Sequence, residues 1–258
     1  MTDKIVQQQV DFLDAALATV QKATQELKFD AGHAPSLFAV ALHATLIELT
    51  RACLSLVTSG DTIGVLILMR SMQEALVDQT NLLSDTEYVK NMHSANLGQM
   101  ARLLEEAAEK QNKLFKGLEE KWDVAKELAD VRAQLKKFED EERGELRIFR
   151  RFEMAGMEAD YRSAYVLQCI DTHNNTTALV ERHIDIGEDG RAQVSLFKEM
   201  EAGTLRARLD AVTAMLVKSA IMMHEAFKTG CKTLAPLQEQ HTKMRQKFFV
   251  NKKNQEGQ

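Results

Sequence analysis

The chain has 258 residues, of which 45% are hydrophobic and 28% are charged, and its formal net charge is −5. Such a composition is that of an ordinary globular protein with enough apolar material for a sizeable core. The negative charge argues against a general nucleic-acid coat, although a local basic patch stays open. With 2 prolines and 12 glycines, the chain lacks the turn residues that an all-β fold needs, whereas good helix formers are abundant. We therefore predict an all-α multi-helix bundle.

Three helices are expected in the first third of the chain. Apolar residues at intervals of three, four and seven predict a helix over about residues 3–27. Pro35 suits the first turn of a second helix, which should run to about residue 57. A third helix over about 62–83 is apolar on most sides, as expected for a helix surrounded by others. Gly60 should end the second helix as a left-handed cap.

A change of character marks residues 103–152, which are dense in charge and carry only an interrupted apolar stripe. We predict two solvent-exposed helices here, broken near Lys116-Gly117 and projecting from the bundle as a charged hairpin. Such a hairpin packs on itself or on a partner. This segment is therefore the expected contact surface of a homo-oligomer or of another protein.

The remaining elements complete one domain over residues 1–240. A helix is expected over about 157–172, and a closing helix over about 198–228. Between them, residues 179–197 read as a short irregular segment or β-hairpin. Residues 241–258 form a basic, flexible tail, which could contact nucleic acid or an acidic membrane or could simply be a solvated end.

Arg70 and Glu74 stand out because they interrupt the apolar third helix. A spacing of four places them side by side on one face. Burying a charge costs several kcal/mol unless it is paired and hydrogen-bonded, so the sequence predicts a satisfied polar network inside the bundle. Two interpretations stay open: a structural ion pair that fixes how the helices dock, and a ligand or catalytic pocket.

A second polar stripe is expected on the helix over 157–172. Tyr161, Tyr165, Cys169 and His173 are spaced by four, so each neighbouring pair shares a face. The phenols and the imidazole can supply donors and acceptors to a carboxylate or guanidinium. The candidate polar pocket therefore consists of Arg70, Glu74, Tyr161, Tyr165 and His173. The alternative is ordinary amphipathic packing with an exposed terminal histidine.

Metal and cofactor chemistry find no support in the motifs. The 7 histidines never lie three or four residues from one another, and no Glu-x-x-His pair occurs. Phosphate-binding glycine loops, Gly-x-Ser-x-Gly elbows and His-Glu-x-x-His helices are likewise missing from the sequence. We expect no metal and no cofactor.

The cysteines and the hydropathy pattern indicate a cytoplasmic protein. Cys53, Cys169 and Cys231 are far apart and odd in number, which favours reduced, buried thiols. The first residues lack the basic start and apolar run of a signal peptide. The stretch 63–69, taken as the most apolar one, is far shorter than the ~20 residues of a membrane span. We therefore expect no contact with a membrane.

A family resemblance adds to this interpretation. The segment Met-Arg-Ser-Met-Gln-Glu-Ala-Leu at 69–76, the charged helix over 87–105 and the Tyr161, Tyr165, His173 pattern resemble an uncharacterised prokaryotic family, the domain of unknown function 5677. The resemblance covers about residues 35–230. It implies an all-helical fold of the broad class that includes nucleotide-binding and ribonuclease toxins of bacterial defence. Those ribonucleases use an arginine followed by a histidine with four to six residues between, a motif that this sequence lacks.

Three functions therefore stay open at the level of the sequence. The first is a helical interaction module, acting through oligomerisation or partner binding in bacterial stress or phage defence. The second is a nuclease-like or nucleotide-processing enzyme that uses Arg70, Glu74 and His173, with RNA as a ligand. The third is ligand sensing in the same pocket.

Overall fold

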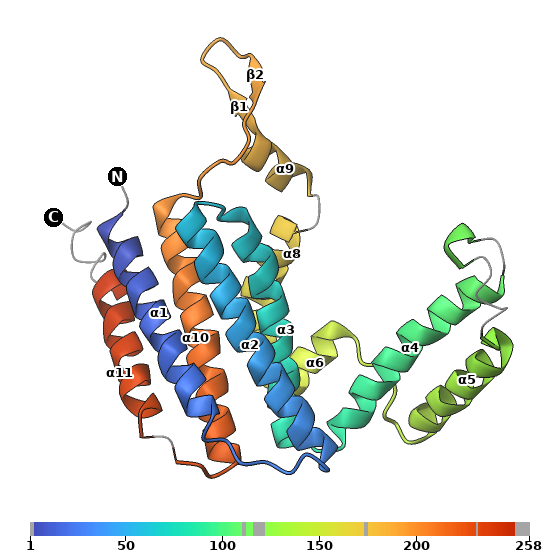
Figure 1. Cartoon of the computed structure of the whole chain (residues 1–258). Helices are drawn as coiled ribbons and strands as arrows, with labels where there is room; N and C mark the ends of the chain where they lie inside the picture. Colours follow the sequence, from blue (N-terminus) through green and yellow to red (C-terminus); the bar gives the residue numbers. More distant parts are fainter. Residues whose placement is uncertain (1–2, 110–111, 116–121, 173–174, 231, 251–258) are drawn as a thin grey trace.

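The computed structural model describes residues 3–109, 112–115, 122–172, 175–230 and 232–250 (Figure 1). It is 76% helical, and the sheet within the described residues has two short strands. The predicted all-α class is confirmed.

Helix α1 (Lys4–Thr24) is amphipathic and lies along one side of the bundle. The Asp3 carboxylate accepts hydrogen bonds from the backbone N–H groups of Ile5 (2.7 Å) and Val6 (3.4 Å), which caps the helix start. Its apolar stripe faces the core, where Val6, Leu13, Ala16, Leu17, Val20 and Ala23 are buried. The spacing of these residues in the sequence therefore sets the face that packs.

Helices α2 (Ala34–Ser59) and α3 (Ile63–Ser84) form a tight antiparallel pair. Gly60 ends α2 with a φ of 82°, a left-handed conformation that glycine adopts without a steric penalty. Gly64 allows the two helices to approach, because a Cβ at that position would lie 2.7 Å from Leu56 Cδ1. The predicted cap at Gly60 is therefore confirmed.

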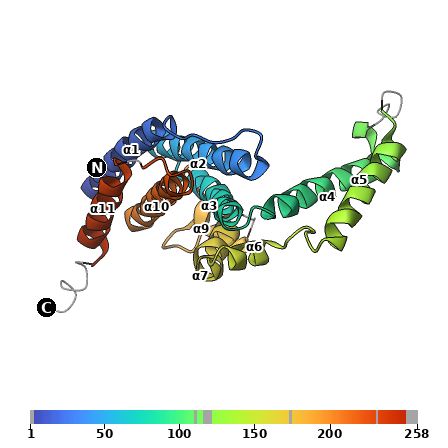
Figure 2. The same ribbon diagram turned by 90° about the horizontal axis from the view of Figure 1, so that it is seen from below.

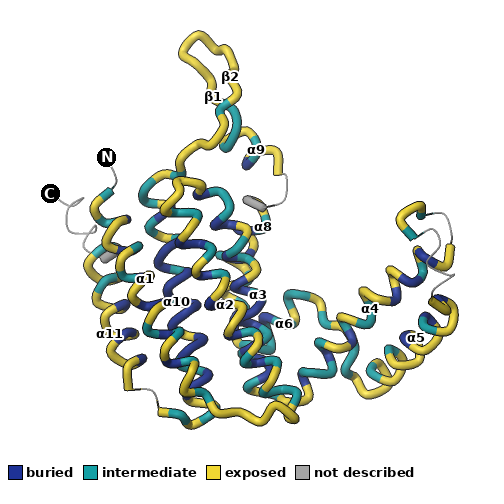
Figure 3. Tube along the Cα trace, viewed as in Figure 1, coloured by how far each residue is buried: buried dark blue, intermediate teal, exposed yellow. Residues whose placement is uncertain are grey.

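Helix α10 (Ala202–Ala226) is the central element of the bundle and contacts α1, α2, α3 and α11 (Leu234–Arg245). The main hydrophobic core gathers around it (Figure 3). Its fully buried members on this helix are Leu209, Val212, Leu216 and Ala220. A helix in contact with four others needs apolar residues on most of its circumference, which is what this sequence has.

The C-terminal segment corrects the prediction of a flexible tail that begins at residue 241. Helix α11 continues to Arg245, and a π-helical turn follows over Gln246–Val250. His241 explains the difference, because it is only 6% exposed and its Nε2 lies 2.8 Å from Asp210 Oδ1. This buried contact holds the helix against α10. Residues 251–258 lie outside the described part.

Helices α4 (Tyr88–Ala108) and α5 (Val124–Asp140) form a projecting hairpin, which we call the arm (residues 88–140). Figures 1 and 2 show it extending away from the bundle in both views. A 3-10 turn (Lys113–Phe115) lies near its tip. The arm has a small core of its own, formed by Ala101, Leu104, Ala107, Val124, Leu128 and Val131. The projecting hairpin predicted over 103–152 is present, with α4 forming more of it than expected.

The end of that predicted hairpin belongs to the bundle instead. Helix α6 (Ile148–Met154) packs on α3, and Phe152 is fully buried in the main core. The chain continues through α7 (Glu158–Asp160), a π-helical turn (Tyr161–Tyr165) and α8 (Val166–Thr172). Helix α8 also packs on α3. The large apolar side chains of this segment therefore cover one side of α3.

A small β-hairpin lies beyond α8. Helix α9 (Thr176–His183) includes residues that we predicted to be non-helical. The helix begins here because the Asn175 side chain caps its start, accepting a hydrogen bond from the Thr177 N–H at 3.0 Å. Strands β1 (Ile184–Ile186) and β2 (Ala192–Val194) then pair antiparallel, with Ile184 opposite Val194 and Ile186 opposite Ala192. The predicted β-hairpin is thus confirmed in a shorter form.

Helix α2 is a longer apolar stretch than residues 63–69, on which the expectation of no membrane span was based. Within the described residues, its length and its mean hydropathy of 1.5 over the best window would allow it to cross a membrane. In the structure, α2 packs against α1, α3 and α10. Core helices of bundles pass the same test, and the expected location therefore stays a prediction.

Candidate functional site

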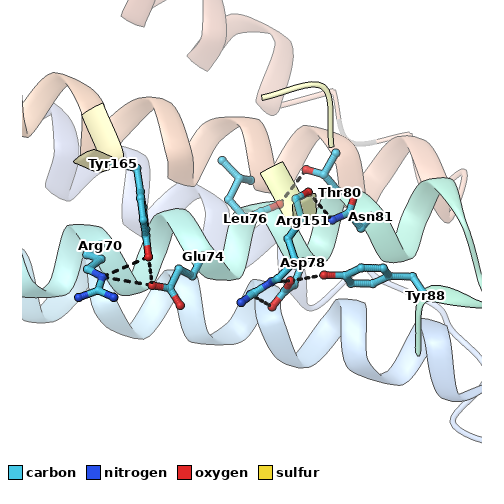
Figure 4. A network of polar contacts seen from close by, with 9 residues as sticks. All are labelled: Arg70, Glu74, Leu76, Asp78, Thr80, Asn81, Tyr88, Arg151 and Tyr165. Atoms are coloured by element: carbon cyan, nitrogen blue, oxygen red, sulfur yellow. Dashed lines mark hydrogen bonds and ion pairs between the residues drawn. The ribbon is translucent and has the colours of Figure 1, made fainter. Parts of the chain in front are cut away.

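Arg70 and Glu74 lie one turn apart on α3 and meet Tyr165 from the π-helical turn (Figure 4). Arg70 Nε donates to Glu74 Oε1 at 3.2 Å and to Tyr165 Oη at 3.4 Å. The Tyr165 hydroxyl donates to the same Glu74 oxygen at 2.9 Å. We call these three residues the Arg70 cluster. Tyr165 of the predicted tyrosine stripe therefore contacts both Arg70 and Glu74.

The Arg70 cluster lies at the side of the bundle and not inside it. The Arg70 side chain is 28% exposed and the Glu74 side chain 31%, whereas Tyr165 is only 4% exposed. Burial raises the pKa of Tyr165, so its hydroxyl stays protonated and serves as a donor. The Arg70 Cζ also lies 5.5 Å from the centroid of the tyrosine ring. The predicted polar network is therefore present, but it lies at the side of the bundle and not inside it.

Tyr161 takes part in packing and not in the polar contacts of Figure 4. Its ring stacks on Tyr165 with a centroid distance of 5.4 Å, and it meets Phe149 and Phe152 edge-on at 5.1 and 5.4 Å. Such aromatic contacts fix the position of Tyr165. His173, the fifth candidate, lies outside the described residues.

A second polar cluster, which the sequence analysis missed, lies one turn further along α3. Asp78 accepts from the Tyr88 hydroxyl at 2.6 Å and from Arg151 Nε at 2.9 Å, and Arg151 Nη2 donates to its second oxygen. Asn81 Nδ2 donates to the Arg151 backbone oxygen at 2.9 Å. Asp78, Tyr88 and Arg151 form the Asp78 cluster (Figure 4). The available signal was the spacing of Arg70, Glu74 and Asp78 by four, which puts all three on one face of α3.

The Asp78 cluster lies beside a cavity at the base of the arm. The cavity measures about 270 Å³, and Asn91, Asn96 and Glu145 are among its polar lining residues. Asp78 is 14% exposed and Arg151 22%, so solvent reaches both only in part. Burial raises the pKa of Tyr88, which keeps its proton and its bond to Asp78. The two charges neutralise each other, as a structural ion pair requires.

A third set of polar contacts surrounds the buried side chain of His43, where α1, α2 and α10 meet. His43 Nδ1 lies 2.7 Å from Ser219 Oγ, and Nε2 lies 3.1 Å from Thr24 Oγ1. His43 and Ser219 are both 0% exposed, so a substrate cannot reach this serine. Burial, followed by the charge of His224, lowers the pKa of His43 to about 4. This histidine is therefore neutral and structural, and its sequence position gave no sign of either contact.

Within the described part of the chain, no group of three or more His, Cys, Asp or Glu side chains could hold a metal ion. Cys53 is buried, and burial raises the pKa of its thiol to about 12, so it stays a protonated apolar group. Cys169 is partly exposed on α8. Cys231 lies outside the described residues.

Comparison with known proteins identifies the family. A family model described as a family of unknown function, DUF5677, matches residues 37–192, which is more than half of the chain. The chain belongs to this family. The matched region includes α3, the arm and both polar clusters, so the match covers the elements that form the candidate site. No curated protein and no solved structure matches the chain.

Proposed function

We propose that this protein is a helical interaction module, which acts by associating with other protein chains and not by transforming a substrate. The arm is the expected contact surface. The expected setting, in line with the resemblance stated above, is bacterial stress or phage defence.

The architecture of the arm carries the proposal. From Leu97 onward, α4 buries its apolar residues against α5 in a core separate from the main core of the bundle, whereas Tyr88 at the start of α4 packs against residues of the bundle. Leu103 and Leu114 remain 52% and 90% exposed on it, and its outer pairs such as Arg132–Glu105 are solvated. A projection with its own core adds nothing to the main core. Its outer surface is therefore free to contact other chains.

The polar clusters support the same conclusion from the other side. In the Arg70 cluster, the guanidinium, the carboxylate and the phenol bond to one another. In the Asp78 cluster, one carboxylate engages both an arginine and a tyrosine. A general base or nucleophile must reach its substrate within hydrogen-bond distance. Groups that bond to one another in this way dock helices, and α3 carries both clusters.

Trimming the arm tests the proposal. Leu97 on α4 and Leu135 on α5 both pack on the arm core, so replacing residues 97–135 by a short Gly/Ser turn removes the projection and keeps its base. We expect this variant to keep the thermal unfolding of the bundle and to lose its protein cross-links in cells of the source organism. Cross-links of the full chain should map to arm lysines that the trimming removes, such as Lys113 and Lys126. Identical cross-links in the trimmed and full chains would contradict the proposal.

The alternative, a nuclease-like or nucleotide-processing enzyme, rests on one observation. Solvent reaches Arg70 and Glu74, whose side chains are 28% and 31% exposed. An RNA-cleavage assay of the full chain, Glu74→Gln and the exposed control Glu87→Gln distinguishes the two functions. Cleavage that Glu74→Gln abolishes and Glu87→Gln leaves intact would favour the enzyme.

A further inference from the structure

The β-hairpin (residues 184–194) exposes an apolar face that the described part of the chain leaves uncovered. It projects from one end of the bundle (Figure 1), and almost all of it is exposed (Figure 3). Ile186 is 71% exposed and Val194 74%, and the residues that follow, Leu196 and Phe197, are 66% and 85% exposed. Single exposed apolar residues need no explanation, but a contiguous group does.

The strand register places four apolar side chains of the two strands together. Ile184 pairs with Val194 and Ile186 with Ala192, while Asp185 pairs with Gln193 between them. Since side chains alternate along a strand, the four apolar residues share one face, and Asp185 and Gln193 lie on the other. The ladder continues at both ends, from the Ser195 N–H to His183 O at 2.8 Å and from the Gly187 N–H to Arg191 O at 2.9 Å. The hairpin is thus a regular amphipathic sheet of two strands.

A hairpin of this size is marginal in water unless its hydrophobic face packs on something. The apolar face, together with Leu196 and Phe197, leaves on the order of 500 Å² of apolar surface in solvent, a patch size that is often functional. The Lys198 ammonium donates to Asp185 at 2.6 Å, and further along the chain the Met200 N–H donates to Thr62 at 3.3 Å, which ties the segment after the hairpin to the start of α3. The chain is thus attached to the bundle just beyond the hairpin, while the apolar face stays exposed.

We propose that the apolar face of the hairpin packs against the same face of a second copy of this chain, across a two-fold axis. This inference rests on the proposed function, association with other chains, and names the surface and the partner. The face can pair with an identical one, since the four apolar side chains of the paired strands carry no charge that would repel their own copies. Two such faces stack about 10 Å apart, as paired sheets do.

Area and charge agree with this partner. Two copies would bury on the order of 1,000 Å², near the lower limit of a specific interface, so the dimer should be reversible. Arg191 pairs with Asp189 at 3.5 Å, so Glu188 leaves the turn of the hairpin with a net negative charge. An antiparallel arrangement of the two hairpins places these turns at opposite ends and keeps the like charges apart. Because the hairpin lies at one end of the bundle, the two bundles extend away from each other (Figure 1).

Sedimentation equilibrium of the full chain tests the inference. Val194→Lys and Ile186→Lys place a charge on the apolar face, and Gln193→Lys places the same charge on the opposite face of the same strand. All three positions are exposed, so the helical content and melting temperature should stay those of the native chain. We expect a reversible native dimer, a dissociation constant raised at least about 100-fold by Val194→Lys or Ile186→Lys, and no change with Gln193→Lys.

Each outcome has a defined meaning. A native chain that stays monomeric overturns the inference, and so does a native dimer that Val194→Lys leaves intact. If that dimer instead disappears when residues 97–135 are trimmed, the arm is the interface between copies, and the proposed function stands without the hairpin. Equal weakening by Val194→Lys and Gln193→Lys would also overturn the inference, because it would indicate a general effect of charge.

Discussion

His43 shows how a single buried side chain makes the stability of this bundle depend on pH. Thr24 Oγ1 donates to Val20 O at 2.8 Å, so its hydroxyl hydrogen is used. The neutral imidazole therefore donates from Nε2 to Thr24 Oγ1 and accepts at Nδ1 from Ser219. A second proton would place a charge in a site that is 0% exposed.

Stability should therefore fall as the pH drops from 6.5 toward 4. The folded pKa of His43, about 4, lies below the ordinary value of 6.5, so the unfolded chain binds more protons in this window. The contribution is complete above pH 6.5 and is lost on acidification, by about 2 kcal/mol between pH 7 and pH 5. Urea unfolding at the two pH values measures it. His43→Gln should show a loss smaller by about that amount, and an equal loss in both chains would contradict the assignment.

The two polar clusters differ in how far local spacing could predict them. Arg70 and Glu74 are neighbours by helix geometry alone, and the tyrosine stripe offered Tyr165 as a partner. Asp78 continues the same face, but its partners Tyr88 and Arg151 come from helices whose docking depends on tertiary packing. No spacing rule relates residues that are 73 positions apart. The sequence therefore predicted the Arg70 cluster, whose members follow from helical spacing. It missed the Asp78 cluster, whose members come from three helices.

At the scale of elements, the arm is a separate packing unit. Its core contains Leu104, which is 1% exposed, and Val131, which is 4% exposed. At its base, the ion pairs Lys90–Glu141 (3.0 Å) and Arg143–Asp85 (2.7 Å) join the segment that enters the arm to the segment that leaves it. Units that share few buried contacts with the rest of a protein open independently of it. The arm should therefore be less stable than the bundle.

Leu104→Ala should loosen the arm alone. The cavity left in this small core costs about 2–5 kcal/mol, enough to open α4 and α5 locally. Hydrogen exchange read by mass spectrometry should accelerate in peptides from α4 and α5 and stay unchanged in α3 and α10. Leu103→Ala, at the adjacent position that is 52% exposed, is the matched control and should leave all peptides as they were. Faster exchange across α10 in Leu104→Ala would show that the arm and the bundle share one core.

Element boundaries were predicted best where the sequence carries its own stop signals. Gly60 ends α2 because its φ of 82° suits glycine, and the amphipathic period of α1 is plain. Helix α6 was assigned to the charged hairpin because Phe152 lies in a run of charged residues, yet that ring is buried in the main core. In the same way, the polar residues around His241 predict a tail from residue 241, whereas α11 continues to Arg245. Both errors arose where one buried side chain, and not the local composition, determines the docking.

At the scale of the whole molecule, the arm gives the protein an extended shape (Figure 2). A compact chain of 258 residues has a radius of gyration of about 18 Å. Small-angle X-ray scattering of Val194→Lys, used here as the expected monomer, should give a larger value. The chain trimmed at residues 97–135 and carrying the same substitution should approach the compact value. A radius of about 18 Å for both would mean that the arm folds back on the bundle in solution.

Asp78 gives this shape a mechanical consequence. Tyr88 begins α4, where the chain enters the arm, and Arg151 lies on α6, shortly after the chain has left it. One carboxylate bonds both, at 2.6 Å to the hydroxyl and at 2.9 Å to the guanidinium. Asp78 therefore joins both ends of the arm to α3, the helix that also carries Arg70 and Glu74. We expect a force that bends the arm to act on α3 through this one carboxylate.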